Sequence, residues 1–174
     1  IDTHAIVNAP ISPTRKWPVV MFSPGYGGPR AFYTGLAEGL AAKGYVVVTL
    51  DHPYESAVTE LPDGSIAAAV DNFPANASHA EGDVWMAKQL DIRAADMRYA
   101  LDQLRPEIIG ADLATHLDLE HVGAIGHSLG GATAVVAMQR DARIRAAANV
   151  DGTPYGAMIG KPLDRPFLLL QSDY

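Results

Sequence analysis

The sequence predicts a single α/β domain, residues 1–174, built on a mostly parallel β-sheet with helices on both of its faces. Five short, almost wholly apolar runs lie along the chain, and glycine, proline or aspartate follows or flanks each of them. Stretches with apolar residues at helical spacing separate several of these runs. Fully apolar strands that alternate with helices are typical of a parallel sheet buried on both faces. A length of 174 residues suits one domain with a sizeable core.

The first third of the chain contains two predicted strands and one helix. The apolar run 17–22 precedes the glycine-rich segment 23–28, which predicts a buried strand followed by a tight loop. Apolar residues then recur at helical spacing over 32–41, and the run 45–50 predicts a second buried strand. The order is therefore strand, loop, helix and strand.

Residues 54–80 differ in composition from the rest of the chain, because they are mostly small and polar. The turn signal Pro62-Asp63-Gly64-Ser65 predicts a small β-hairpin within them. A connection of this length inside a compact domain is usually a lid or a binding loop. We therefore expect residues 54–80 to form a lid or binding loop.

The second half of the chain continues the alternation. A long helix is predicted from an apolar stripe formed by Met86, Leu90, Met97, Leu101 and Leu104. Strands are predicted at 122–125, 144–150 and 166–170, with a helix from Ser128 to about Arg140 between the first two. Reactive groups of parallel sheets gather at the carboxyl ends of the strands. Those ends carry Tyr26, Asp51, Ser128, Asp151 and Asp173.

The candidate nucleophile is Ser128, which occupies the centre of a Gly-x-Ser-x-Gly motif between an apolar strand and an apolar helix. A sharp strand-to-helix turn needs small neighbours, and it lifts the serine hydroxyl above the sheet at the helix N-terminus. The N–H groups and the positive dipole end there stabilise an oxyanion. The alternative interpretation is a helix N-cap serine without chemical function.

A serine nucleophile needs a general base, and the base needs an orienting acid. His127 adjoins Ser128, but we expect it to point away and to serve in packing or hydrogen bonding. The other histidines also precede Ser128: His4, His52, His79, His116 and His121. In α/β enzymes that carry a Gly-x-Ser-x-Gly turn, the triad follows the chain order serine, acid and histidine. We therefore expect the base and a final strand to lie beyond Tyr174. The alternative is a pseudoenzyme that has lost its base.

Two acids follow the serine, and either one could orient a histidine. Asp151 ends the strand after the nucleophile helix, and Asp173 ends the next strand. Asp151 also fits a turn residue before Gly152, and Asp173 also fits a solvated carboxylate.

Several segments together resemble the platelet-activating-factor acetylhydrolase family, a branch of the α/β-hydrolases near dienelactone hydrolases and bacterial cutinases. These segments, in the family's order, are residues 22–28, 51–57, 126–133, 149–152 and 166–174. The resemblance implies Asp151 as the catalytic acid, with Asp173 as the alternative, and backbone N–H groups of Tyr26 and Leu129 as the oxyanion hole. Pro24 stands where the animal enzymes typically show histidine, which weakens any transfer of their substrate preference.

The expected function is hydrolysis of a small-molecule or lipid carboxylic ester through an acyl-enzyme, with no cofactor and no metal. The rivals are a cutinase-like or dienelactone-hydrolase-like polyesterase and a non-catalytic binding protein on the same fold. A formal charge of −7 makes nucleic acid an unfavourable partner. No apolar stretch is long enough for a membrane span, and cysteine is absent from the sequence. The chain begins at Ile1 rather than Met, so secretion after signal-peptide removal stays open, as do the compartment and the oligomeric state.

Overall fold

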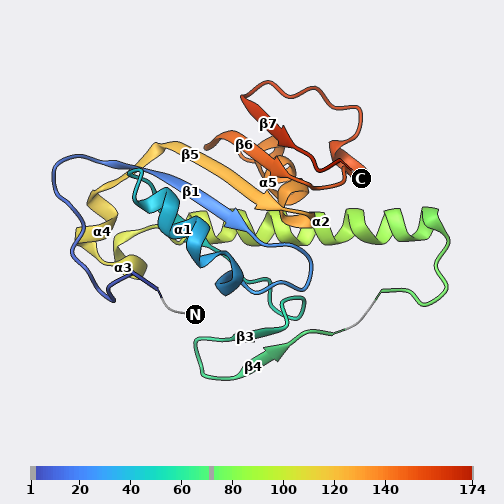
Figure 1. Cartoon of the computed structure of the whole chain (residues 1–174), viewed down its shortest axis with the longest axis horizontal. Coiled ribbons are helices and arrows are strands. Elements are labelled where there is room, and N and C mark those ends of the chain that lie inside the picture. The colour runs from blue at the N-terminus through green and yellow to red at the C-terminus, as the bar shows by residue number, and fades with distance from the viewer. Residues whose placement is uncertain (1–2, 71–72, 174) are drawn as a thin grey trace.

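The computed structural model describes residues 3–70 and 73–173, and its centre is a five-stranded sheet (Figure 1). The strand order is β2-β1-β5-β6-β7, and every neighbouring pair runs parallel. The strands are β1 (Trp17–Ser23), β2 (Val46–Thr49), β5 (Leu117–His127), β6 (Ile144–Val150) and β7 (Phe167–Leu170). The prediction of an α/β domain with a parallel sheet is confirmed.

The register of the strands brings their carboxyl ends to one edge of the sheet. Ser23 of β1 pairs with Gly126 of β5, and His127 of β5 pairs with Val150 of β6. Val150 in turn pairs with Leu170 of β7. The loops that follow β1, β5, β6 and β7 therefore start side by side.

Helices lie on both faces of the sheet, but they cover the two faces unequally. Helix α5 (Leu129–Arg140) packs on β5 and β6, and the long helix α2 (His79–Asp102) packs against α5 on the same side (Figure 1). Helix α1 (Thr34–Ala41), which the 3₁₀ turn η1 (Arg30–Tyr33) precedes, packs against β2 on the opposite face. The buried apolar core therefore lies mainly between the sheet, α5 and α2.

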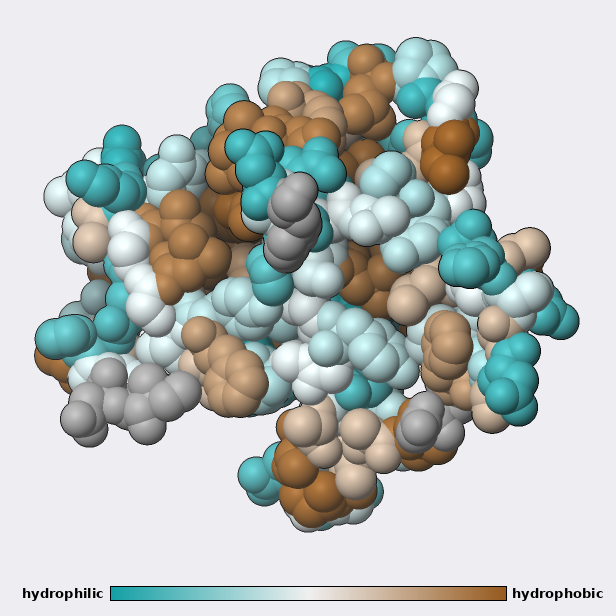
Figure 2. Space-filling view, turned by 45° about the vertical axis from the view of Figure 1, so that its right-hand side comes forward, coloured by the Kyte–Doolittle hydropathy of each residue, from teal (hydrophilic) through white to brown (hydrophobic). Residues whose placement is uncertain are grey.

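The second face of the sheet is open over β5, β6 and β7. A shallow apolar cleft lies there, and all four residues of β7 are between 39% and 52% exposed. Figure 2 shows hydrophobic side chains at the top of the molecule, where the C-terminal residues lie, and at the bottom, where a hairpin projects. That hairpin consists of β3 (Val58–Glu60) and β4 (Ile66–Ala68), which pair antiparallel as the turn signal predicted.

A capping box marks the start of helix α2. The Ser78 side chain accepts from the Glu81 N–H, and the Glu81 carboxylate accepts from the Ser78 N–H, which completes a capping box. Leu90, Met97 and Leu101 of the predicted stripe are buried against the core. Of the described helices, none is both long enough and apolar enough to cross a membrane.

Several short elements were not anticipated. They are α3 (Pro106–Ile109), α4 (Ala111–Thr115), the 3₁₀ turn η2 (Gly156–Met158) and the first five residues of β5. Each is too short to develop a periodic pattern, and residues 117–121 carry three charged or ionisable side chains that hide the strand.

Candidate active site

Ser128 occupies a strained turn between β5 and α5. Its φ and ψ are 52° and −127°, a conformation that costs a residue with a side chain about 1–3 kcal/mol. The Ser128 N–H donates to the Val150 carbonyl at 2.8 Å, and the Ser128 carbonyl accepts from the Gly131 N–H at 2.9 Å. The turn is therefore held in place from β6 on one side and from α5 on the other.

The two motif glycines leave space for this turn. A Cβ placed on Gly126 would lie 2.6 Å from the Ser23 carbonyl oxygen and closer still to the backbone of Gly130. A Cβ on Gly130 would lie 2.6 Å from the carbonyl carbon of Ser23 and even closer to its oxygen. Although Ser128 stands at the N-cap position of α5, its side chain forms no capping hydrogen bond, so the plain N-cap interpretation finds no support.

Ser128 lines a cavity of about 780 Å³ at the carboxyl edge of the sheet. Asp151, at the end of β6, lines the same cavity, and apolar side chains contribute much of the remaining wall: Val135, Met158, Leu163, Phe167 and Leu169. No described residue of 54–80 lines this cavity, whereas several residues of the segment 152–163 do. The role of residues 54–80 as a lid or binding loop stays a prediction.

Hydrogen bonds from neighbouring residues fix the backbone and the carboxylate of Asp151 at the edge of the cavity. Its φ is 59°, and its N–H donates to the Leu170 carbonyl at 2.7 Å. Its carboxylate accepts from the Ser172 N–H at 3.1 Å and from the Ser172 hydroxyl at 2.8 Å. The alternative acid, Asp173, is exposed and is not among the residues that line the cavity.

Asn149 supports the loop that carries Asp151, and sequence reasoning missed it. The Asn149 side chain, which is 2% exposed, accepts from the Gly152 N–H at 2.8 Å and donates to the Gly152 carbonyl at 2.9 Å. This pair of bonds closes the turn after β6. An asparagine within an otherwise apolar run, two residues before the Asp151-Gly152 pair, was the available signal in the sequence.

The two expected oxyanion donors lie on elements that meet at Ser128. Leu129 is the first residue of α5, where backbone N–H groups lack intrahelical acceptors. Tyr26 belongs to the loop after β1, and that loop approaches closely: a Cβ on Gly25 would lie 3.5 Å from the Ser128 Cβ. The Tyr26 ring packs edge-on against Trp85 of α2, with 5.6 Å between ring centroids. Any contribution of Tyr26 to the oxyanion hole is therefore made by its backbone.

His127 forms a hydrogen bond with a residue other than Ser128, as expected. Its Nδ1 lies 2.9 Å from the hydroxyl of Tyr33, which itself accepts from the Gly25 N–H at 3.2 Å. Within residues 3–70 and 73–173, no histidine forms a hydrogen bond with Ser128, and His127 is the one histidine that lines the cavity.

A buried polar chain lies beneath the β1 loop. The Ser23 hydroxyl is 2.9 Å from His52 Nε2, and His52 Nδ1 is 2.8 Å from the Asp96 carboxylate. Burial is the largest influence on the pKa of His52 and lowers it, and the charge of Arg93 also lowers it. Asp96 and Asp51 oppose that shift without cancelling it. A neutral His52 that donates from Nδ1 to Asp96 and accepts at Nε2 from Ser23 gives each of these polar groups a hydrogen-bond partner.

The lowered pKa of His52 predicts a loss of stability in mild acid. The unfolded chain, with the usual histidine pKa of 6.5, takes up the proton at a higher pH than the folded protein does. This contribution to stability is therefore complete above the unfolded pKa and is lost as the pH falls toward the folded value. Urea unfolding at several pH values between about 7 and 5 is expected to show a falling free energy of unfolding that His52→Gln flattens.

His79→Gln is the matched control, because His79 is exposed at the start of α2 and lies outside the His52 network. It is expected to leave the pH slope as in the wild type. An equal slope in wild type and His52→Gln would show that His52 is not the group responsible.

The described residues contain no group of three or more His, Cys, Asp or Glu side chains that could hold a metal ion. The polar groups at the cavity include the Ser128 hydroxyl and the Asp151 carboxylate, and the first N–H groups of α5 lie next to Ser128. Together they suit attack on a carbonyl group and stabilisation of the negative charge that forms.

Comparison with known proteins places this arrangement in a family. The family model for platelet-activating factor acetylhydrolase, isoform II, matches residues 1–174. A probable 1-alkyl-2-acetylglycerophosphocholine esterase of Arthroderma benhamiae is 29% identical over 87% of the chain and 36% of its own length. The platelet-activating factor acetylhydrolase of Cavia porcellus is 26% identical over 96% of the chain and 42% of its own length. The chain thus spans less than half the length of these curated relatives.

Solved structures agree with this family. A ferulic acid esterase from Streptomyces cinnamoneus superposes with a TM-score of 0.80 and 35% identity, over 97% of this chain and 46% of that one. An acetyl xylan esterase from Paenibacillus sp. R4 shares the fold, with a TM-score of 0.53 at 20% identity over 79% of this chain and 40% of that one. The chain belongs to the platelet-activating factor acetylhydrolase isoform II family of α/β-hydrolases.

Proposed function

We propose that the protein hydrolyses carboxylic esters and that Ser128 is its nucleophile. The observation that carries this proposal is the position of Ser128: a strained turn at the N-terminus of a buried helix, open to a cavity that Asp151 also lines. Backbone strain in a residue with a side chain is maintained by its surroundings and is concentrated at functional sites. A serine that only capped the helix would not need this conformation.

The chemistry follows from the groups around the serine. Ser128 Oγ attacks the ester carbonyl carbon, and the carbonyl oxygen becomes an oxyanion that accepts from the N–H groups of Leu129 and Tyr26. Collapse of this intermediate expels the alcohol and leaves an acyl group on Ser128. Water then attacks the acyl-enzyme and releases the carboxylic acid. The residues of this chain supply the nucleophile, the oxyanion donors and the acid.

The general base would be a histidine that is not among these 174 residues. Its imidazole would lie in the cavity between Ser128 and Asp151, where it takes the proton of Oγ and later gives it to the leaving alcohol. Asp151, held by Ser172, would orient that ring and stabilise its protonated form. The position of Asp151 in the cavity supports it over Asp173.

The apolar part of the cavity wall favours an ester with an apolar acyl or alcohol group. The names of the curated relatives suggest an acetylated glycerophosphocholine, which makes a lipid ester the first candidate substrate. An aromatic ester is the second candidate, because the ferulic acid esterase shares 35% identity and a TM-score of 0.80. Residues 54–80 are proposed to act as a lid or binding loop toward such substrates.

The proposal is tested by treating the full-length protein with a fluorophosphonate probe and locating the adduct by peptide mass spectrometry. We expect one covalent adduct, on Ser128, and hydrolysis of p-nitrophenyl acetate by the unlabelled enzyme. Ser128→Ala is expected to lose the adduct and to lower kcat by about a million-fold, as for other serine hydrolases.

Ser12→Ala is the matched serine control, because Ser12 is exposed and does not line the cavity of Ser128, and it is expected to retain labelling at Ser128. A folded full-length protein that neither reacts with the probe nor hydrolyses esters would instead be a binding protein on a hydrolase fold.

A further inference from the structure

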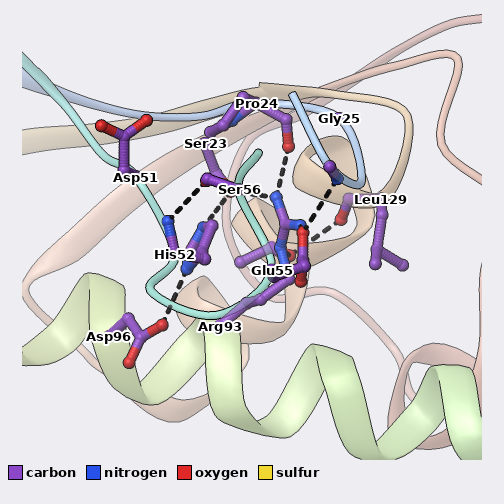
Figure 3. A network of polar contacts seen from close by, with 12 residues as sticks. Ser23, Pro24, Gly25, Asp51, His52, Glu55, Ser56, Arg93, Asp96 and Leu129 are labelled. Atoms are coloured by element: carbon purple, nitrogen blue, oxygen red, sulfur yellow. Dashed lines mark hydrogen bonds and ion pairs between the residues drawn. The ribbon is translucent and has the colours of Figure 1, made fainter. Parts of the chain in front are cut away.

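The guanidinium of Arg93 lies at the centre of a buried polar network that joins four segments of the chain (Figure 3). Arg93 projects from α2, and it is 1% exposed. Its Nε donates to the Thr133 hydroxyl at 3.1 Å, one terminal nitrogen pairs with Glu55, and the other donates to the Ser23 hydroxyl at 3.0 Å and to the Pro24 carbonyl. The guanidinium has five N–H groups, so these contacts nearly satisfy it.

Two of these contacts fix the loop that carries Tyr26. Arg93 holds the Pro24 carbonyl on the N-terminal side of Tyr26. Its ion-pair partner Glu55 accepts from the Gly27 N–H at 3.4 Å on the C-terminal side. The loop is therefore held on both sides of Tyr26 by one ion pair.

The remaining contact leads to the other oxyanion donor. The Thr133 hydroxyl accepts from Arg93 Nε and donates its own proton to the Leu129 carbonyl at 2.8 Å. Leu129 opens α5, and its N–H is the second expected donor. The Arg93 guanidinium thus contacts the Pro24 carbonyl in the loop of Tyr26 and the Thr133 hydroxyl that bonds Leu129.

We propose that Arg93 is a positioning residue that sets the distance and orientation of the Tyr26 and Leu129 N–H groups relative to the oxyanion. The inference rests on the proposed ester hydrolysis at Ser128. The guanidinium touches neither substrate nor nucleophile, because Arg93 does not line the cavity of Ser128. Preorganised donors lose much of their effect when they are displaced, and a misplacement of about 1 Å costs about 100-fold in rate.

Stability alone does not account for this network. Burial raises the pKa of the Glu55 carboxyl group, and the charge of Arg93 opposes that rise. Keeping both charges buried therefore has a desolvation cost, and apolar residues of similar volume often stabilise a fold as well as a buried ion pair does. What the guanidinium adds is geometric: a planar fork can hold two backbone segments in a fixed relation.

The neighbouring Ser23–His52–Asp96 chain resembles a triad in its bonding, but it does not serve as a second active site. The Ser23 side chain is 0% exposed and its hydroxyl already accepts from Arg93. No ester can reach it in the fold described. The hydrogen bonds from Asp96 through His52 to Ser23 instead orient the Ser23 hydroxyl so that it accepts from the Arg93 guanidinium. These three residues therefore belong to the same buried network as Arg93.

The test compares Arg93→Lys with wild type in the full-length enzyme, on p-nitrophenyl acetate and with a trifluoromethyl ketone that forms a tetrahedral adduct with the serine. Lysine keeps the charge but lacks the fork. We expect kcat to fall by about 10- to 100-fold with KM within about twofold. The inhibition constant of the ketone is expected to rise by the same factor as kcat/KM falls. A merely structural role would reduce the amount of folded enzyme without changing that inhibition constant.

Two further variants keep the test decisive if Arg93→Lys folds poorly. Thr133→Val keeps nearly the same side-chain shape and removes the hydroxyl that joins Arg93 Nε to the Leu129 carbonyl. The other Arg93 contacts remain, so this variant is expected to weaken binding of the ketone by a smaller factor than Arg93→Lys. Arg143→Lys is the matched control, since Arg143 bonds Asp141 at the opposite end of α5 and is expected to leave kcat and the inhibition constant unchanged.

The outcomes separate the two proposals. A wild-type enzyme that reacts at Ser128, together with folded Arg93→Lys and Thr133→Val variants of unchanged kcat and inhibition constant, would overturn the role of Arg93 alone. A wild-type enzyme without reaction at Ser128 would overturn the proposed function itself.

Discussion

Asp151→Asn is expected to lower kcat for ester hydrolysis by about 10⁴-fold while leaving KM and the fold largely unchanged. Asparagine keeps the size of the side chain and can still accept from Ser172, so the turn after β6 should hold. It removes the negative charge that orients the imidazole in the correct tautomer and stabilises the imidazolium. Steady-state kinetics on p-nitrophenyl acetate, with circular dichroism of both proteins, measures the effect.

Asp173→Asn is the matched control, because Asp173 follows the neighbouring strand but is exposed and outside the cavity lining. Its kcat is expected to stay within about twofold of the wild type, as for surface substitutions away from a site. The reverse result, with Asp173→Asn inactive and Asp151→Asn active, would move the catalytic acid to Asp173.

Gly130→Ala is expected to reduce the free energy of unfolding by about 3 kcal/mol and to lower kcat sharply in the folded fraction. The added methyl group would overlap the backbone of Ser23 and Pro24, so β1 and α5 must separate. That separation would displace the loop of Tyr26 from Leu129, which are the two expected oxyanion donors. Urea unfolding and kinetics measured well below the unfolding transition check both effects.

Gly35→Ala is the control for a glycine-to-alanine change in a helix. Gly35 lies in α1, and a Cβ there would meet nothing within 4 Å. It is expected to raise the free energy of unfolding by about 0.5–1 kcal/mol and to leave kcat unchanged. An unchanged free energy of unfolding in Gly130→Ala would contradict the close approach of β1 and α5. An equal loss of stability in Gly35→Ala would show that the effect of Gly130→Ala is not specific to this close approach.

The strands and the serine turn were predictable because their signals are local. Runs such as 17–22 and 144–150 are apolar along their whole length, and burial on both faces of a parallel sheet requires this. The motif around Ser128 combines small residues with a preceding strand and a following helix, all within about twenty residues of sequence. Its strained φ of 52° follows from those neighbours.

The choice between Asp151 and Asp173 was not determined by the residues themselves, since each aspartate follows a predicted strand. The fold separates them: β6 lies next to β5, so its end faces Ser128, whereas Asp173 lies beyond the end of the outer strand. Part of the cavity wall is likewise formed by residues 152–163, whose sequence shows no periodic pattern.

The burial of Arg93 shows where local reasoning ends. Arg93 falls on the same face of α2 as Leu90 and Met97, so a charged residue on an apolar stripe was visible in the sequence. Its partners were not, because Ser23, Glu55 and Thr133 come from three other segments of the chain. The sequence by itself determined which segments become strands and helices and which serine is presented on the turn, since those depend on neighbouring residues. Only the tertiary structure decided which acid lines the cavity with that serine and which segments the buried guanidinium joins, because such contacts connect residues that are distant along the chain.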